Sequence, residues 1–206
     1  MKNPVAIDLY HITDVANLPN IVAAGALLSD LALGSVEHEV IGYGHIKQRR
    51  MTEYRVPCCG GRFVGEFVPF YYCPRSPMLF TINKGNSGRP AGCQRDIVHL
   101  VCTVQDALDL EQPWAISDGN AGAAHTTFSS SLDAFDALNW AAIETNSWAG
   151  MTHQKQAEFL VADRLPWTAI RTIACHNTNT ARRVKELIRT TPHQPVIMVK
   201  PDWYYP

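Results

Sequence analysis

Two stretches of the chain carry residues that could do chemistry on a nucleic acid. The first runs from His45-Ile-Lys-Gln-Arg-Arg50 to Phe67-Val-Pro-Phe-Tyr-Tyr-Cys-Pro-Arg-Ser-Pro-Met78, and it mixes cations with aromatic rings. Arginine beside aromatic side chains suits single-stranded nucleic acid, because every base has a face that can stack. The second, Lys155-Gln-Ala-Glu-Phe-Leu-Val161, places the carboxylate of Glu158 before an apolar run that is typical of a buried strand. Such a carboxylate is rarely buried without a partner, so Glu158 is either catalytic or part of a structural ion pair with an arginine.

The charges of the chain are unevenly distributed. The net charge is −1, yet residues 45–95 contain nine Lys and Arg but only two Glu, which leaves this segment at +7. A strongly cationic segment in an otherwise acidic chain indicates a face that binds a polyanion. The other interpretation is a solvated basic loop, but the interleaved aromatic residues favour nucleic acid.

Several functional classes lack their signatures. The chain has no GxSxG, GxxxxGK[ST], HExxH or GxGxxG pattern. Its six cysteines form no CxxC pair and no zinc-like spacing with histidine, so we expect no metal. No apolar run reaches the length of about 18 residues that predicts a membrane span, and the N-terminus has no apolar core of a signal peptide. We therefore expect a cytoplasmic protein with reduced thiols.

The elements that position these residues follow from periodicity and capping. With 206 residues, of which 46% are hydrophobic, the chain is predicted to form one domain over 1–206. We predict strands over 8–13, 68–72, 78–83, 96–104, 158–161, 170–175 and 196–200, helices between 14 and 25 and over 132–144 and 180–189, and a helical turn near 46–51. Strands outnumber helices and do not alternate with them regularly, which favours an α+β domain.

Six stretches, in this order along the chain, resemble the DarT family of DNA ADP-ribosyltransferase toxins. They are Tyr10-His-Ile-Thr13 with Asn17-Leu-Pro-Asn-Ile21, His45 to Arg50, Val68 to Met78, Gln156-Ala-Glu-Phe-Leu-Val161 and the ending Lys200-Pro-Asp-Trp-Tyr-Tyr205. The resemblance implies an ADP-ribosyltransferase-like fold, with a central mixed or antiparallel β-sheet flanked by helices. It also implies that NAD donates ADP-ribose to a base of single-stranded DNA, most often thymine, so that nicotinamide is released and DNA replication is blocked.

The resemblance further implies a partner and roles for particular residues. The partner is an antitoxin macrodomain protein that removes the modification, and we expect the chain itself to be a monomer. Glu158 and Arg50 would be catalytic, and the residues that would bind NAD are His11, Thr13, Asn17, Arg50 and Tyr71. With the basic segment included, the DNA-binding candidates are Lys47, Arg49, Arg55, Arg75, Asn120 and His125.

One departure from the family pattern leaves the acceptor open. Asn120 stands where similar proteins carry a histidine near the substrate base, and His125 follows it by a few residues. A related NAD-dependent transferase that acts on guanine or on RNA is therefore one alternative. The other is a nucleic-acid-binding domain without catalysis, in which Glu158 only forms an ion pair.

Overall fold

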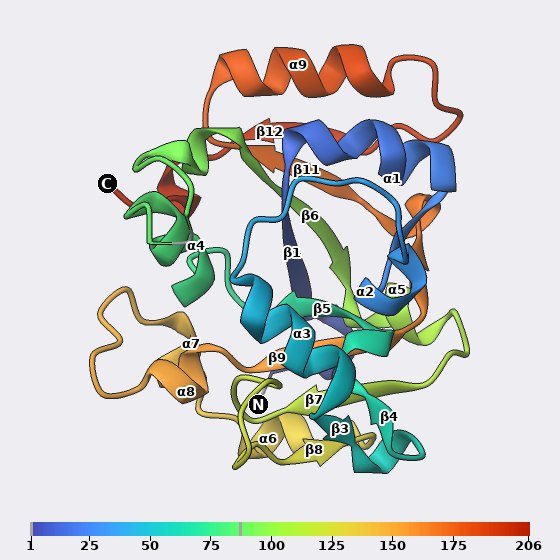
Figure 1. Cartoon of the computed structure of the whole chain (residues 1–206), viewed down its shortest axis with the longest axis vertical. Coiled ribbons are helices and arrows are strands. Elements are labelled where there is room, and N and C mark those ends of the chain that lie inside the picture. Colours follow the sequence, from blue (N-terminus) through green and yellow to red (C-terminus); the bar gives the residue numbers. More distant parts are fainter. Residues whose placement is uncertain (1, 87) are drawn as a thin grey trace.

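Most strands of the chain belong to one mixed sheet (Figure 1). The computed structural model describes residues 2–86 and 88–206, and within them the main sheet has eight strands in the order β12-β11-β6-β1-β5-β9-β7-β8. Two small sheets pair β10 with β2 and β3 with β4. The strands are β1 Asp8–Asp14, β2 Ala26–Leu28, β3 Arg55–Val56, β4 Arg62–Phe63, β5 Phe67–Tyr71, β6 Ile97–Thr103, β7 Trp114–Ser117, β8 Phe128–Ser129, β9 Glu158–Ala162, β10 Arg164–Pro166, β11 Thr172–Cys175 and β12 Val196–Val199.

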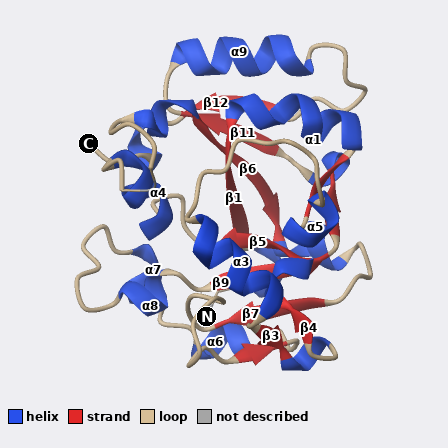
Figure 2. Cartoon of the chain, in the orientation of Figure 1, coloured by secondary structure: helices blue, strands red, loops and turns tan. Residues whose placement is uncertain are grey.

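Short helices flank this sheet. The helices are α1 Leu18–Ala24, α2 Asp30–Leu33, α3 Gly44–Thr52, α4 Pro77–Asn83, α5 Val104–Leu108, α6 Ala134–Ala137, α7 Trp140–Glu144, α8 Thr152–Lys155 and α9 Thr178–Ile188. Figure 2 shows α1 and α9 together at one end of the molecule, α6 to α8 toward the other, and α3 across the middle. Among the described residues, no helix is long and apolar enough to cross a membrane. The α+β class predicted from the sequence is confirmed, and the sheet is mixed because β11 and β12 pair in parallel.

Strand β9 is buried, and its sequence after Glu158 is a continuous apolar run. All five residues of β9 are buried, since β5 and β7 cover its two edges and apolar clusters cover its faces. Side chains alternate along a strand, so Phe159 and Val161 join the main core while Leu160 and Ala162 join a smaller cluster with Phe67. Glu158 shares its face with Leu160 and Ala162, and this register determines where its carboxylate points.

Two of the predicted elements were wrong. Residues 78–83 are not a strand but part of α4, because the Ser76 side chain accepts a hydrogen bond from Leu79 N at 3.2 Å and Pro77 occupies the first turn. The predicted helix over 132–144 is instead the two short helices α6 and α7. The break between them falls at Asn139, whose side chain accepts from Ala142 N and caps α7 anew.

The other predicted elements agree with the structure to within a few residues. The helical turn expected near 46–51 is the nine-residue helix α3. The helix expected between 14 and 25 begins with a short 3₁₀ turn, continues as α1 and ends at Gly25, whose φ of 65° suits a glycine. The helix expected over 180–189 is α9, capped by the side chain of Asn177.

Fully buried His99 on β6 should make the fold sensitive to mild acid. Burial lowers the pKa of His99 from 6.5 to about 4, and its Nε2 lies 2.9 Å from Pro74 O. Between pH 6.5 and 4, His99 is therefore protonated in the unfolded chain but stays neutral in the folded chain. We expect the free energy of unfolding to fall by roughly 3 kcal/mol between pH 6.5 and 4 through this residue. Urea unfolding at several pH values should show a shallower decline in His99→Gln, and identical declines would contradict the assignment.

Candidate active site

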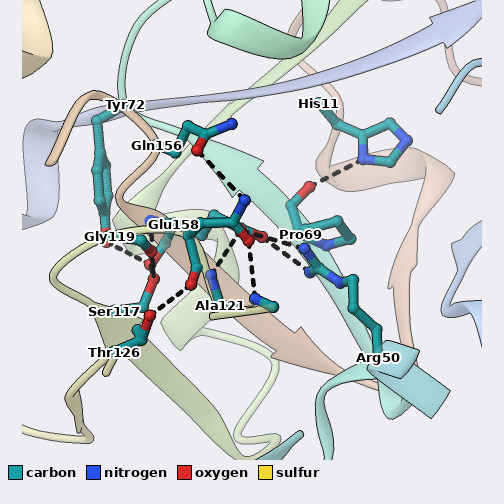
Figure 3. Close-up of polar contacts among 12 residues, drawn as sticks. His11, Arg50, Pro69, Tyr72, Ser117, Gly119, Ala121, Thr126, Gln156 and Glu158 are labelled. Atoms are coloured by element: carbon teal, nitrogen blue, oxygen red, sulfur yellow. Dashed lines mark hydrogen bonds and ion pairs between the residues drawn. The ribbon is translucent and has the colours of Figure 1, made fainter. Parts of the chain in front are cut away.

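Glu158 is held at both its main chain and its side chain (Figure 3). Its amide donates to Ser117 Oγ at 3.0 Å, and its carbonyl accepts from Tyr72 OH at 3.1 Å. Its carboxylate oxygen Oε1 accepts from Ala121 N at 3.0 Å. Tyr71 lies directly opposite Glu158 in the β5–β9 register. These contacts fix the direction of the carboxylate before any ligand binds.

Arg50 reaches Glu158 from α3 and forms a two-point ion pair with it. Arg50 Nη1 donates to Oε1 at 3.1 Å and Nη2 donates to Oε2 at 2.8 Å (Figure 3). The side chains of Arg50 and Glu158 are only 13% and 2% exposed. Burial alone would lower the pKa of Arg50, but the adjacent Glu158 carboxylate outweighs it and the pKa is raised. The pair therefore combines a permanent positive charge with a carboxylate of fixed direction.

The ion pair lines a cavity of about 610 Å³. The cavity lies among β1, α1, α3, β5 and the loop that joins α2 to α3. A cavity of this volume can hold a small-molecule ligand or a cofactor. Of the residues predicted from the sequence, those that line it are His11, Thr13, Asn17, Lys47, Arg50, Tyr71, Asn120 and Glu158.

Four predicted residues lie outside the cavity. Arg49 pairs with Glu53, with 2.7 Å between Nε and Oε2. The Arg55 guanidinium lies 3.8 Å from the centre of the Phe63 ring, and the Arg75 guanidinium lies 6.0 Å from the centre of the Tyr205 ring.

His125 is the fourth residue outside the cavity. It is exposed and packs on His153, with 4.2 Å between the ring centres.

The basic segment presents fewer free cations than its net charge indicates. Within residues 2–86 and 88–206, five of its nine cations pair with carboxylates, namely Lys47 with Asp30, Arg49 with Glu53, Arg50 with Glu158, Arg62 with Glu66 and Asp163, and Arg89 with Asp14 and Glu39. Several of these acids lie outside residues 45–95, so a count of charge along the segment could not include them.

His11 and Tyr71 are neutral polar groups at the cavity wall. Nδ1 of His11 lies 2.9 Å from Pro69 O, so this nitrogen carries the proton and Nε2 is left as an acceptor. Burial lowers the pKa of His11, which favours the neutral ring. Burial and the nearby Glu158 carboxylate raise the pKa of Tyr71, so its hydroxyl keeps its proton. Both side chains can hydrogen-bond a ligand without adding charge.

Sequence reasoning missed Gln156, which also lines the cavity. Gln156 Oε1 accepts from Asn120 Nδ2 at 3.2 Å, and Asn120 directly precedes Ala121, whose amide binds Glu158, so the two side-chain amides form a pair near the carboxylate. Its position two residues before Glu158 is the signal that could have found it, because such residues share one face of an extended chain. The burial of Lys155 was also not predicted. Its Nζ donates to the carbonyls of Ile143 and Thr145.

Comparison with known proteins identifies similar sequences and structures. Residues 10–205 match the family described as "ssDNA thymidine ADP-ribosyltransferase, DarT". A DNA ADP-ribosyl transferase of Thermus aquaticus is 35% identical over 204 residues, which covers 98% of this chain and 90% of the relative. Thermus sp. 2.9 DarT in complex with ADP-ribosylated ssDNA has a TM-score of 0.92 and 33% identity, covering 99% of this chain and 98% of that chain. The same protein in complex with NAD⁺ has a TM-score of 0.87 and 31% identity, with 99% of each chain covered.

These likenesses define the class as NAD-dependent DNA ADP-ribosyltransferases. Within that class, the match over almost the whole length settles the family: the chain belongs to the DarT family. The resemblance noted from the sequence motifs is thus confirmed, and so is the expected fold. Among the described residues, no three or more His, Cys, Asp or Glu side chains lie together in a way that could hold a metal ion.

Proposed function

We propose that this chain transfers ADP-ribose from NAD to thymine in single-stranded DNA, with Glu158 and Arg50 at the reacting centre. The observation that carries this proposal is the buried Arg50–Glu158 pair on the wall of a 610 Å³ cavity. The relatives bound to NAD⁺ and to ADP-ribosylated single-stranded DNA support the donor and the acceptor.

The reaction breaks one bond to ribose C1′ and forms another. Nicotinamide leaves with the bonding electron pair, and C1′ becomes an oxocarbenium-like centre. The Glu158 carboxylate stabilises this positive charge, and its effect is large because the site is largely shielded from water. A ring nitrogen of the base attacks C1′ and loses its proton to Glu158, which acts as the general base.

Arg50 changes partner as this proton moves. In the free protein both terminal nitrogens of its guanidinium bind Glu158. When Glu158 takes the proton it loses its charge, and its hold on the guanidinium weakens. A carbonyl oxygen of the base gains negative charge at the same step, so Arg50 can donate to it instead. On the sequence alone, an ion pair at Glu158 is an alternative to catalysis. In this proposal the Arg50–Glu158 pair is the state of the catalytic centre before the reaction begins.

The remaining cavity residues divide between donor and acceptor. We assign His11, Thr13 and Tyr71 to NAD, because they line the β1 and β5 side of the cavity and stay uncharged. We assign Asn120 and Gln156 to the target base, because their amides lie beside Glu158 and can hydrogen-bond a base edge. Lys47 at the cavity wall, together with Arg49, Arg55, Arg75 and His125 outside it, is proposed to contact the DNA strand.

The biological setting is also part of the proposal. We propose that residues 1–206 act as one domain, because strands from both ends of the chain enter one sheet, and that the protein is a monomer. We further propose a toxin that blocks DNA replication in the cytoplasm and is opposed by an antitoxin macrodomain protein. Thermosipho africanus DarTG in complex with ADP-ribose, of which this chain covers 51%, has the same fold.

One experiment tests the reaction and both alternatives together. The protein is incubated with NAD and a mixed set of single-stranded DNA and RNA oligonucleotides, and mass spectrometry locates the adduct. We expect ADP-ribose on thymine of DNA, with one nicotinamide released for each adduct. An adduct on guanine or on RNA would contradict the acceptor. Oligonucleotide binding without an adduct or nicotinamide release would favour a non-catalytic binding domain.

A further inference from the structure

The loop that joins α2 to α3, residues 34–43, forms one wall of the cavity through Val36 and residues 38–43. In Figure 1 this loop runs beside α1 and then descends to α3. Two of its apolar side chains, Val36 and Val40, are exposed, whereas Ile41 near its end packs against an apolar cluster that includes Ile12. We infer that Arg89 and Asn17 hold this loop closed over the cavity and are positioning residues for the capture of NAD. This inference rests on the proposed placement of NAD.

Asn17 binds the loop through its backbone. Nδ2 of Asn17 donates to Glu39 O at 2.9 Å, and Oδ1 accepts from Glu39 N at 2.8 Å. Its other amide hydrogen goes to Thr13 Oγ1 at 3.1 Å, and the residue is buried. Both donor hydrogens of this amide are therefore used within the protein. The NAD-binding role expected for Asn17 is on this view indirect, because the side chain holds the cavity wall.

Arg89 binds the same loop residue from the other side. Its guanidinium pairs with the Asp14 carboxylate, and its Nη1 lies 3.6 Å from Glu39 Oε2. Asp14 is buried at the end of β1, directly after Thr13, whereas the Glu39 side chain is 61% exposed. Arg89 does not line the cavity. It therefore connects a buried carboxylate of the sheet to an exposed carboxylate of the loop.

Two further contacts hold Glu37 and His38, the loop residues next to Glu39. Asn20 Nδ2 donates to Glu37 O at 2.9 Å, and Lys47 Nζ lies 2.9 Å from His38 Nε2. Residues 37–39 of the loop are thus attached by polar contacts to α1, to α3 and, through Arg89, to β1, and apolar packing of the loop is confined to Ile41 near its end. Segments of this kind open at a low free-energy cost, so the loss of one contact should change how often the cavity is open.

The test compares two glutamates of the same loop. Glu39→Ala removes the carboxylate that Arg89 reaches, and Glu37→Ala is the control because its exposed side chain forms no ion pair among the described residues. In Glu39→Ala we expect hydrogen exchange of the loop amides, and KM for NAD, to rise roughly two- to tenfold, the scale of one lost polar contact. The kcat should stay near wild type, since the contact is equal in ground and transition states. Arg89→Met should raise the same two quantities but should also destabilise the protein, because it leaves the buried Asp14 carboxylate without its partner.

Each outcome separates the loop from the chemistry. Equal exchange in the Glu39 and Glu37 variants would overturn the inference, and so would faster exchange with an unchanged KM for NAD. A drop in kcat with unchanged KM would also overturn it, because that pattern belongs to a group acting in the transition state. Failure of the proposed function would be distinct, since the wild-type protein would then release no nicotinamide with any DNA.

Discussion

Replacement of Glu158 by glutamine should reduce transfer of ADP-ribose to DNA by at least about a hundredfold, the scale expected for loss of a general base. Glutamine keeps the shape of the side chain and can still accept from Ala121 N, but it cannot take a proton from the base or stabilise the positive charge at C1′. Binding of NAD and of DNA should stay within a few-fold of wild type. Single-turnover kinetics with a labelled oligonucleotide, together with equilibrium binding, would measure both.

Glutamine is preferable to alanine at this position because Arg50 is nearly buried. Glu158→Ala would leave the guanidinium without its partner, and removal of one member of a buried pair destabilises a protein by about 3–5 kcal/mol. Glu53→Gln is the matched control, since it neutralises an exposed partner of the neighbouring Arg49. Transfer at the wild-type rate in Glu158→Gln would remove Glu158 from the mechanism.

Annealing a complementary strand to a good substrate should suppress modification by at least about two orders of magnitude. Glu158 is only 2% exposed, so the ring nitrogen of the base must enter the cavity to reach its carboxylate. In a duplex that nitrogen is paired, and extruding the base costs a few kcal/mol of unpairing and unstacking. Each 1.4 kcal/mol of that cost lowers the rate about tenfold.

The duplex experiment needs a control for the added strand. A non-complementary strand at the same concentration should leave the rate unchanged, whereas a complement with one mismatch opposite the target should restore part of it. If the fully paired duplex reacts as fast as the single strand, the base does not enter the cavity in the way proposed. Glu158 could still be catalytic in that case, so this result bears on the binding mode alone.

The sequence allowed the catalytic residues to be predicted better than the contacts that hold them in place. Glu158 could be found because a carboxylate at the head of an apolar strand is rare, and Arg50 because it lies in a basic, aromatic stretch. Their contact could not be derived from spacing, since 108 residues separate them and strand order decides whether they meet. The family resemblance assigned both residues to catalysis but did not predict the ion pair between them.

Two further features, the helix α4 and the number of free cations in residues 45–95, could not be predicted from local sequence patterns for physical reasons. The run 78–83 has the apolar content of a strand, and only the Ser76–Pro77 start indicates a helix. The net charge of the basic segment overstated its free cations, because acids from other parts of the chain neutralise several of them, such as Asp14 beside Arg89. Tertiary ion pairs of this kind leave no trace in local composition.

The place of β9 in the sheet has a consequence for how the protein is made. This strand carries Glu158 and lies between β5 and β7, both of which come earlier in the chain. The chain up to about residue 162 must therefore have emerged from the ribosome before β9 can insert between β5 and β7 and Glu158 can contact Arg50. Until then the nascent polypeptide holds every cation of its basic segment but no reactive centre. Translation of such a protein thus yields harmless intermediates until β9 emerges, and any fragment that ends before β9 should be tolerated by the cell that makes it.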